Sequence, residues 1–260
     1  MKQSKFKKKY KALMIDVDGT LIRNSVKEVL PSKKVREAIS KADRLIYVGL
    51  ATSRPYPFVS HLLKNLGISG PCILTSGAQI YDPVKKKVVY EKIIDKTLVS
   101  KIFKIVNKYN LTVLDDGRGE KGNLKRKDIN RPIQLWFQVH DQEKVDDIFS
   151  DMSTLPSLSV HKIISRFDGN VELLIGHTEA TKQHGILKVA EILGIETHDI
   201  IGVGDGYNDF PLLMACGLKI AMGNAVADIK AIADYIAPSV EEDGVADVIE
   251  KFVLKNEKHN

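Results

Sequence analysis

Short runs of apolar residues alternate along the chain with segments in which apolar residues recur every three or four positions. The runs "ALMI", "LIYVGLA", "PCILT" and "DIIGVG" each end abruptly at small or polar residues. Helical spacing follows the first two runs, in "KVREAISKA" and "YPFVSHLLKNLGI". Buried strands that alternate with amphipathic helices are typical of βαβ units. The pattern therefore predicts an α/β fold with a doubly wound parallel sheet that helices cover on both faces.

The middle of the chain has a different pattern. Helical spacing appears in "DKTLVSKIFKIVNKYN" and "QEKVDDIFSDM", and strand-like runs appear in "RPIQLWFQVH", "SLSVHKIISRF" and "NVELLIG". Two helices with a few strands make an α+β unit of their own, which we predict as an inserted cap. The prediction divides the chain into a basic tail, a main domain and a cap, at residues 1–10, 11–85 with 177–260, and 86–176. The aromatic residues of the cap are interpreted as its buried core: Tyr109, Trp136 and Phe137.

Composition and charge indicate an ordinary globular protein. Hydrophobic residues make up 43% of the chain and charged residues 28%, and no apolar run approaches the ~18 residues of a membrane span. The net charge of +6 equals the charge of six lysines near the N-terminus, so the rest is nearly neutral and no nucleic-acid partner is expected. Cys72 and Cys216 lie in apolar runs without disulfide or metal-ligand spacing. We predict two core thiols and a cytoplasmic protein.

Acidic and hydroxyl residues follow the predicted strands of the main domain. They are Asp16 and Asp18 after the first run, then Thr52, Ser76 and Asp205 after the later ones. Ligands of open parallel sheets bind beyond the carboxyl ends of the strands, so these residues are expected to converge on one site. Lys182, at the start of a predicted helix, is expected to reach the same rim.

These residue types suit phosphoryl transfer. Asp16, Asp18 and Asp205 offer the oxygen ligands that Mg²⁺ prefers, while Thr52, Lys182 and the N–H groups of a glycine-containing turn suit an anionic phosphoryl group. An aspartate is ionised at neutral pH and needs no activating base, so Asp16 is predicted to attack and form an aspartyl-phosphate. Asp18 points the same way along an extended segment. It is predicted to protonate the leaving group and then to activate water.

The chain resembles the haloacid dehalogenase superfamily of phosphohydrolases in four motifs that follow one another in the right order. They are "DVDGT" at residues 16–20, "LATSR" at residues 50–54, the helix opened by Lys182, and "GDGYND" at residues 204–209. The segment "AMGNAVADIKAIADYIAPSVEEDGVADVIEKF" is similar to the Cof-type branch, which carries a C2-type cap after the third core strand. The resemblance implies a Rossmann-like catalytic core and a Mg²⁺-dependent phosphatase of a small phosphorylated metabolite.

The resemblance also implies particular site residues. It assigns to Mg²⁺ the carboxylates of Asp16 and Asp205 and the backbone carbonyl of Asp18, with Asp209 behind them. The implied phosphate-binding residues are Gly19, Thr52, Ser53, Arg54, Ser76, Gly77, Lys182 and Asn208. Three residues depart from the usual Cof pattern, in which Gly, Asn and Gly stand at the positions of Ser53, Ser76 and Gln183. None of the three removes a charged catalytic group. Ser76 is expected to change the hydrogen bonds near the substrate, so the relatives do not fix the specificity at this position.

Two other functions also fit the motifs. A phosphomutase on the same scaffold would pass the phosphoryl group from Asp16 to a sugar hydroxyl instead of to water. A phospho-accepting signalling module would keep the phosphoryl group, although such domains are shorter and lack an Asp two residues further on. The expected partner is a small phosphate ester, a sugar phosphate or a phosphoglycolate-like acid, and the expected state is a monomer or a homodimer.

Overall fold

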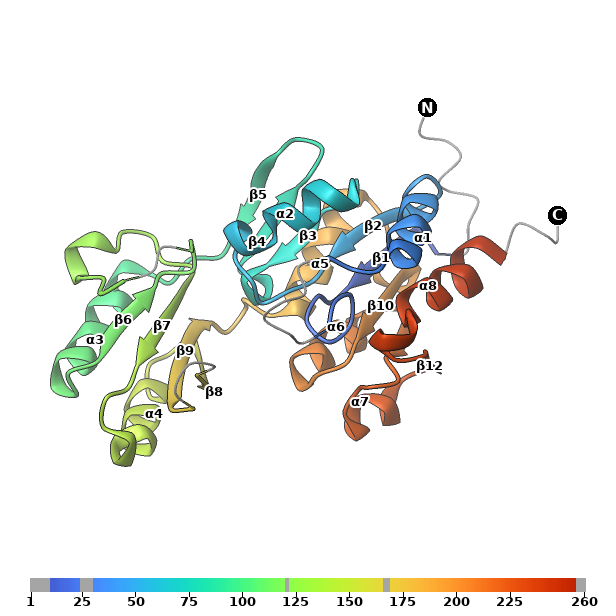
Figure 1. The fold of residues 1–260 in the computed structure, drawn as a ribbon. Helices are drawn as coiled ribbons and strands as arrows, with labels where there is room; N and C mark the ends of the chain where they lie inside the picture. The colour runs from blue at the N-terminus through green and yellow to red at the C-terminus, as the bar shows by residue number, and fades with distance from the viewer. Residues whose placement is uncertain (1–9, 24–29, 120–121, 166–168, 256–260) are drawn as a thin grey trace.

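A parallel sheet of five strands forms the centre of the computed structural model, which describes residues 10–23, 30–119, 122–165 and 169–255 (Figure 1). The strand order is β12-β11-β10-β1-β2, and all four pairings are parallel. The strands are β1 (Ala12–Ile15), β2 (Tyr47–Leu50), β10 (Ile200–Gly204), β11 (Leu218–Ala221) and β12 (Tyr235–Ile236). The predicted α/β class with a parallel core sheet is confirmed.

Helices cover both faces of this sheet, because alternate residues of each strand point to opposite sides. Leu13 and Ile15 of β1 belong to one hydrophobic cluster with α1, α2, α7 and α8. Ala12 and Met14 belong to another, with α5 and α6. The helices are α1 (Lys33–Asp43), α2 (Tyr56–Leu66), α5 (Lys182–Leu193), α6 (Phe210–Ala215), α7 (Ala227–Ile232) and α8 (Gly244–Ile249).

A small antiparallel sheet lies next to β2. It contains β3 (Cys72–Leu74), β4 (Gln79–Asp82) and β5 (Lys87–Glu91). A parallel bridge between Ala51 and Ile73 joins it to the end of β2. The hairpin of β4 and β5 was not foreseen in the sequence, and the predicted start of the cap at residue 86 falls at its turn.

The inserted cap is a four-stranded antiparallel sheet with two helices on one face. The strand order is β6-β7-β9-β8. The elements are α3 (Lys96–Lys108), β6 (Thr112–Asp115), β7 (Gln134–Gln138), α4 (Val145–Ser153), β8 (Leu158–Ile164) and β9 (Val171–His177). Figure 1 shows the cap beside the core, joined to it by the segments that follow β5 and β9. The cap has a hydrophobic core of its own, which includes residues of α3, α4 and the sheet.

The prediction for the cap aromatics is correct for one residue and wrong for another. Phe137 is fully buried in the cap core, and Tyr109 packs against it. Trp136 is only half-buried and lies outside that core. The reason is the alternation along a strand: because Phe137 faces the helices, its neighbour Trp136 faces away from them.

Three other expectations from composition concern the cysteines, membrane spans and the basic tail. Cys72 and Cys216 are free, buried thiols, as predicted. No helix in the described part of the chain is long and apolar enough to cross a membrane. The predicted basic tail lies outside the described residues except for Tyr10.

Candidate active site

Three of the candidate residues follow neighbouring strands at one edge of the core sheet. Asp16 comes directly after β1, and Asp205 comes directly after β10. Thr52 is the second residue after β2, with Ala51 between them. The register aligns Ile15 with both Leu50 and Val203, so the three strands end at the same level. Their polar side chains therefore emerge side by side although they are far apart in the sequence.

Lys182 joins two acids of this edge. It opens α5, whose N-cap is Thr181, with the Thr181 side chain accepting from the backbone N–H of His184. Its Nζ lies 2.6 Å from Oδ1 of Asp16 and 2.5 Å from Oδ1 of Asp209. Burial of Lys182 acts to lower its pKa, but the two carboxylates outweigh this effect and raise the pKa. The ammonium group is therefore charged, and it fixes one oxygen of each acid.

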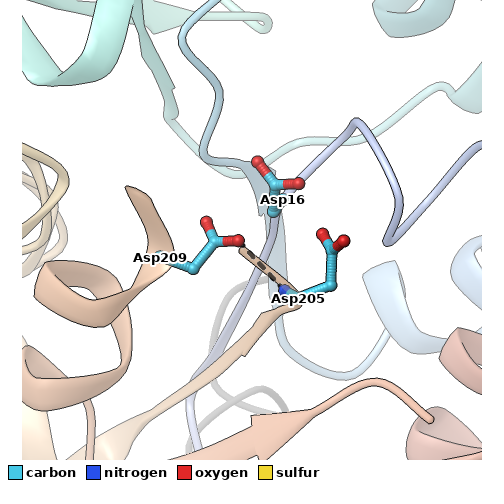
Figure 2. Close-up of side chains that lie close together, drawn as sticks. All are labelled: Asp16, Asp205 and Asp209. Atoms are coloured by element: carbon cyan, nitrogen blue, oxygen red, sulfur yellow. Dashed lines mark hydrogen bonds between the residues drawn. The ribbon is translucent and has the colours of Figure 1, made fainter. Parts of the chain in front are cut away.

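The three acids Asp16, Asp205 and Asp209 form a cluster in which one oxygen of each lies within 4.8 Å of the others (Figure 2). Asp209 is fully buried. Its Oδ2 accepts from the backbone N–H groups of Asp205 and Gly206, both at 3.0 Å. Thr20 donates its hydroxyl to Oδ1 of Asp205 at 2.9 Å. Each acid is therefore held in a defined orientation by at least one donor.

The electrostatics of this cluster fit a divalent cation. Burial is the main cause that raises the pKa of Asp16 to about 8. Lys182 opposes this rise, and the charges of Asp209 and Asp205 add to it. Burial is also the main cause that raises the pKa of Asp205 to about 6. A cation beside the three acids would lower the pKa of Asp16 and of Asp205 and so favour their ionised carboxylates. Carboxylate oxygens are the ligands that Mg²⁺ prefers, so the residues present suit this ion.

Asp18 has a different partner from Asp16. Nε of Arg54 donates to Oδ2 of Asp18 at 2.9 Å, and Nη2 donates to Oδ1 at 2.5 Å. The paired side chains are 26% and 27% exposed, so water reaches them. Arg54, which is expected at the phosphate from the sequence, therefore pairs with Asp18 in the structure.

Tight turns bring the backbone close to the acids and to α5. Gly19 has a φ of +83°, and a Cβ there would lie 2.2 Å from Oδ2 of Asp205. Gly77 has a φ of +113°, and a Cβ there would lie 2.1 Å from the carbonyl oxygen of Thr181. Only glycine avoids both clashes, and only glycine adopts these angles freely. Ser76, before Gly77, is itself left-handed, and its N–H donates to the carbonyl oxygen of Thr52.

The remaining candidate residues differ in how closely the structure ties them to the cluster. Thr52 is buried, and its Oγ1 accepts from the backbone N–H of Arg54 at 3.1 Å. Within the described residues, Ser53 and Asn208 make no hydrogen bond with the acids, and Asn208 is exposed.

Two further residues of the site were missed in the sequence. Thr20 contacts Asp205, as described above. Asn224 donates to the carbonyl oxygen of Gly19 at 2.8 Å and accepts from the N–H of Val240 at 2.9 Å. Asn224 lies in the segment "AMGNA", which is part of the similarity to the Cof-type branch. That similarity could have identified Asn224 as a residue of the site.

Comparisons with known proteins agree with this geometry. The sequence model of the haloacid dehalogenase-like hydrolases matches residues 13–119 and 116–249. The chain is 29% identical to the 5-amino-6-(5-phospho-D-ribitylamino)uracil phosphatase YcsE of Bacillus subtilis, over 94% of this chain and 96% of that protein. It is 28% identical to a phosphoglycolate phosphatase of Methanosarcina acetivorans, over 93% and 96% of the two chains.

Solved structures show the same architecture. A haloacid dehalogenase-like hydrolase from Bacteroides thetaiotaomicron has a TM-score of 0.78 with 26% identity, and the match covers 93% of this chain and 99% of that one. The chain therefore belongs to the haloacid dehalogenase-like hydrolase family, and its resemblance to the Cof-type phosphatases is confirmed.

Proposed function

We propose that this haloacid dehalogenase-like hydrolase is a Mg²⁺-dependent phosphatase in which Asp16 takes the phosphoryl group from a small phosphorylated metabolite. Membership of the family, together with the phosphatases among its relatives, supports the reaction class. The observation that carries the assignment of the nucleophile is the network of Lys182, Asp16 and Asp209 at the edge of the sheet.

The network gives Asp16 the properties of a nucleophile. Lys182 holds Oδ1 of Asp16 at 2.6 Å, so the carboxylate has one fixed orientation and Oδ2 is the oxygen left to attack. Nearby, the hydroxyl of Thr52 and the backbone N–H of Asp18 are proposed to bind the phosphoryl oxygens. The N–H of Gly19 already donates to the carbonyl oxygen of Ile22 at 2.8 Å. A preoriented nucleophile and preoriented donors lower the barrier because they need no rearrangement during the reaction.

Asp18 is proposed to move the protons. It would protonate the leaving alcohol and then remove a proton from the water that hydrolyses the aspartyl-phosphate. In the structure both of its oxygens accept from Arg54, so this ion pair must open before Asp18 carries a proton. An arriving phosphate dianion offers Arg54 a second partner of the same geometry. We therefore propose that substrate binding draws Arg54 toward the phosphate and frees Asp18.

A Mg²⁺ ion would be held by the carboxylates of Asp16 and Asp205, with the backbone carbonyl of Asp18 as the third ligand that the family implies. When bound, it reduces the repulsion between the attacking carboxylate and the negatively charged phosphate ester. Asp209 is proposed to act behind these ligands, since its oxygens are already occupied by Lys182 and two backbone N–H groups.

The relatives do not select one substrate. Two of them, 29% and 28% identical to this chain, are named for different phosphate esters, 5-amino-6-(5-phospho-D-ribitylamino)uracil and phosphoglycolate. We propose a sugar phosphate or a phosphoglycolate-like acid as the substrate class. A screen of phosphorylated metabolites that compares kcat/KM in the presence of Mg²⁺ would identify the substrate.

The nucleophile is tested by Asp16→Asn, with release of inorganic phosphate from a simple aryl phosphate as the measurement. We expect turnover to fall at least about a thousandfold, because the amide cannot attack. Asp199→Asn is the matched control: it makes the same change at another buried acid, which pairs with Lys11, and it should keep full activity. Substantial turnover by Asp16→Asn would refute the assignment, and transfer to a sugar hydroxyl without phosphate release would indicate a mutase.

A further inference from the structure

A hollow lies where the cap loop that contains Arg118 meets the core. It is a pocket of about 310 Å³ between the start of α2, the hairpin of β4 and β5, and the cap loop that follows β6. Tyr56 and Pro57 line it from α2, and Arg118 lines it from the cap. Tyr56 comes two residues after Arg54, which holds Asp18. This pocket is called here the hairpin pocket, and its α2 wall begins two residues beyond Arg54 in the sequence.

One wall of the hairpin pocket is aromatic. The ring centroids of Tyr56 and Tyr81 are 4.6 Å apart, and their hydroxyl oxygens are 3.4 Å apart. Tyr81 is buried, whereas Tyr56 is 38% exposed. The pair presents ring surface and hydroxyl groups to the same space, a surface that binds small organic molecules well.

The cap loop forms another wall and is fixed to the core. Nη1 of Arg118 donates to Oε1 of Glu91 at 3.0 Å, and Gln79 donates to the same oxygen at 2.7 Å. The next residue, Gly119, lies so close to α2 that a Cβ there would be 2.7 Å from Cγ of Pro57. These contacts hold the guanidinium of Arg118 at the pocket and connect the cap to the core at this point.

The mouth of the pocket carries positive charge that the described residues do not neutralise. Lys86 and Lys87 line the pocket from the hairpin turn, and neither forms an ion pair within the described part of the chain. Their neighbour Lys85 differs, because its Nζ lies 3.0 Å from Oδ2 of Asp82. Two unpaired ammonium groups at the rim of a partly apolar pocket attract an anion.

We propose that the hairpin pocket binds an anionic group, a phosphate or a carboxylate, of a small organic molecule. Lys86 and Lys87 supply the charge, and the rings of Tyr56 and Tyr81 pack against the organic part. The volume of about 310 Å³ equals that of about ten water molecules at ~30 Å³ each, enough for such a group. Two ligands share this chemistry. One is the far end of the substrate's leaving group, and this alternative rests on the proposed function. The other is a separate free anion.

The test compares wild type with the double variant Lys86→Gln/Lys87→Gln and with Lys85→Gln. Glutamine keeps a long polar side chain while removing the charge. Lys85→Gln is the matched control, since it removes the same charge from the same turn but its lysine pairs with Asp82 and does not line the pocket.

The first arm measures kcat/KM, with Mg²⁺, for alkyl phosphates of increasing length that end in either a carboxylate or a methyl group. If the leaving group reaches the pocket, wild type and Lys85→Gln prefer the carboxylate end at one length, and the double variant loses about tenfold of that preference. The methyl-ended esters serve a separate purpose. Their turnover tests the proposed function itself and should be equal in all three proteins.

The second arm titrates phthalate, an aromatic dicarboxylate, into the Mg²⁺-loaded protein and measures binding by calorimetry. If the ligand is a free anion, phthalate binds the double variant about tenfold more weakly than wild type, while the kinetic preference is absent. The proposal is wrong if neither arm distinguishes the double variant from wild type. It is equally wrong if Lys85→Gln reproduces the loss, because the effect would then be general surface charge.

Discussion

Replacing Lys182 with Met would remove the positive charge that holds the acidic cluster together. The ammonium group lies 2.6 Å from Asp16 and 2.5 Å from Asp209, and the side chains of all three residues are at most 4% exposed. Methionine is unbranched and flexible, so it can fill most of the space that the lysine chain leaves. The substitution therefore isolates the loss of one charge and two hydrogen bonds.

The expected loss of stability depends on pH. Removing one partner of a buried ion pair costs about 3–5 kcal/mol, because the other charge is left uncompensated. For a chain of this size that corresponds to a fall of roughly 10 °C in Tm, expected in metal-free protein at about pH 8. Lys182 acts to lower the pKa of Asp16, which burial nevertheless raises to about 8. Without the ammonium group that pKa rises further, so at about pH 5 a protonated Asp16 needs no counter-charge and the loss shrinks.

Thermal unfolding with a metal chelator, at about pH 5 and about pH 8, measures this difference. Lys108→Met is the control, because Lys108 pairs with Asp151 at 2.8 Å and the two side chains are 60% and 37% exposed. Exposed pairs contribute at most about 1 kcal/mol, so the control should change Tm little at either pH. If Lys182→Met lost no more than the control, or lost more at the lower pH, the charge of Lys182 would not be what stabilises the cluster.

Two further predictions concern the metal and the proton shuttle. Burial raises the pKa of Asp16 to about 8 and that of Asp205 to about 6, from an ordinary value of 3.8 for both. The stability that these two acids contribute to metal-free protein should therefore be full below that ordinary value and be lost as the pH rises through 6 and then 8. Mg²⁺ should reverse this loss, and equal pH slopes in Tm with and without Mg²⁺ would contradict the assignment of the site. Arg54→Lys cannot form with the phosphate the two-bond pair that Arg54 is proposed to form, so kcat should fall about tenfold with little change in Tm. Arg36→Lys, on the exposed face of α1, is its control, and equal kcat for the two variants would refute the role of Arg54.

The sequence predicted those features of the fold and site that follow from local rules. The strands that precede Asp16, Thr52 and Asp205 are parallel neighbours in the structure. Periodicity predicted the strands, and the rule that ligands bind beyond the carboxyl ends of parallel strands placed these residues at one edge. Periodicity could not show which of Trp136 and Phe137 faces the cap helices, because alternation in a strand leaves the phase open. The hairpin pocket was also beyond prediction, since it depends on how the cap loop at Arg118 docks on α2.

The ion pair of Asp18 and Arg54 marks a further limit. Both residues lie just beyond strand ends, where the direction of a side chain depends on the local turn and not on the strand. The sequence places Arg54 near both the carboxylate of Asp18 and the expected phosphate. It does not show which of the two Arg54 binds before the substrate arrives.

The ion pair of Asp18 and Arg54 explains how two aspartates with one residue between them can perform different tasks. Asp16 is buried and bonded to Lys182, which is itself fixed by Asp209, so its carboxylate has one orientation and no exchange with water. Asp18 is 27% exposed and bonded to an arginine that is also partly exposed, so its partner can leave. A nucleophile gains from a fixed position, whereas a group that gives up and takes back a proton needs a bond that opens. The environments of the two acids, more than their spacing, therefore support the proposal that Asp16 attacks and Asp18 transfers protons.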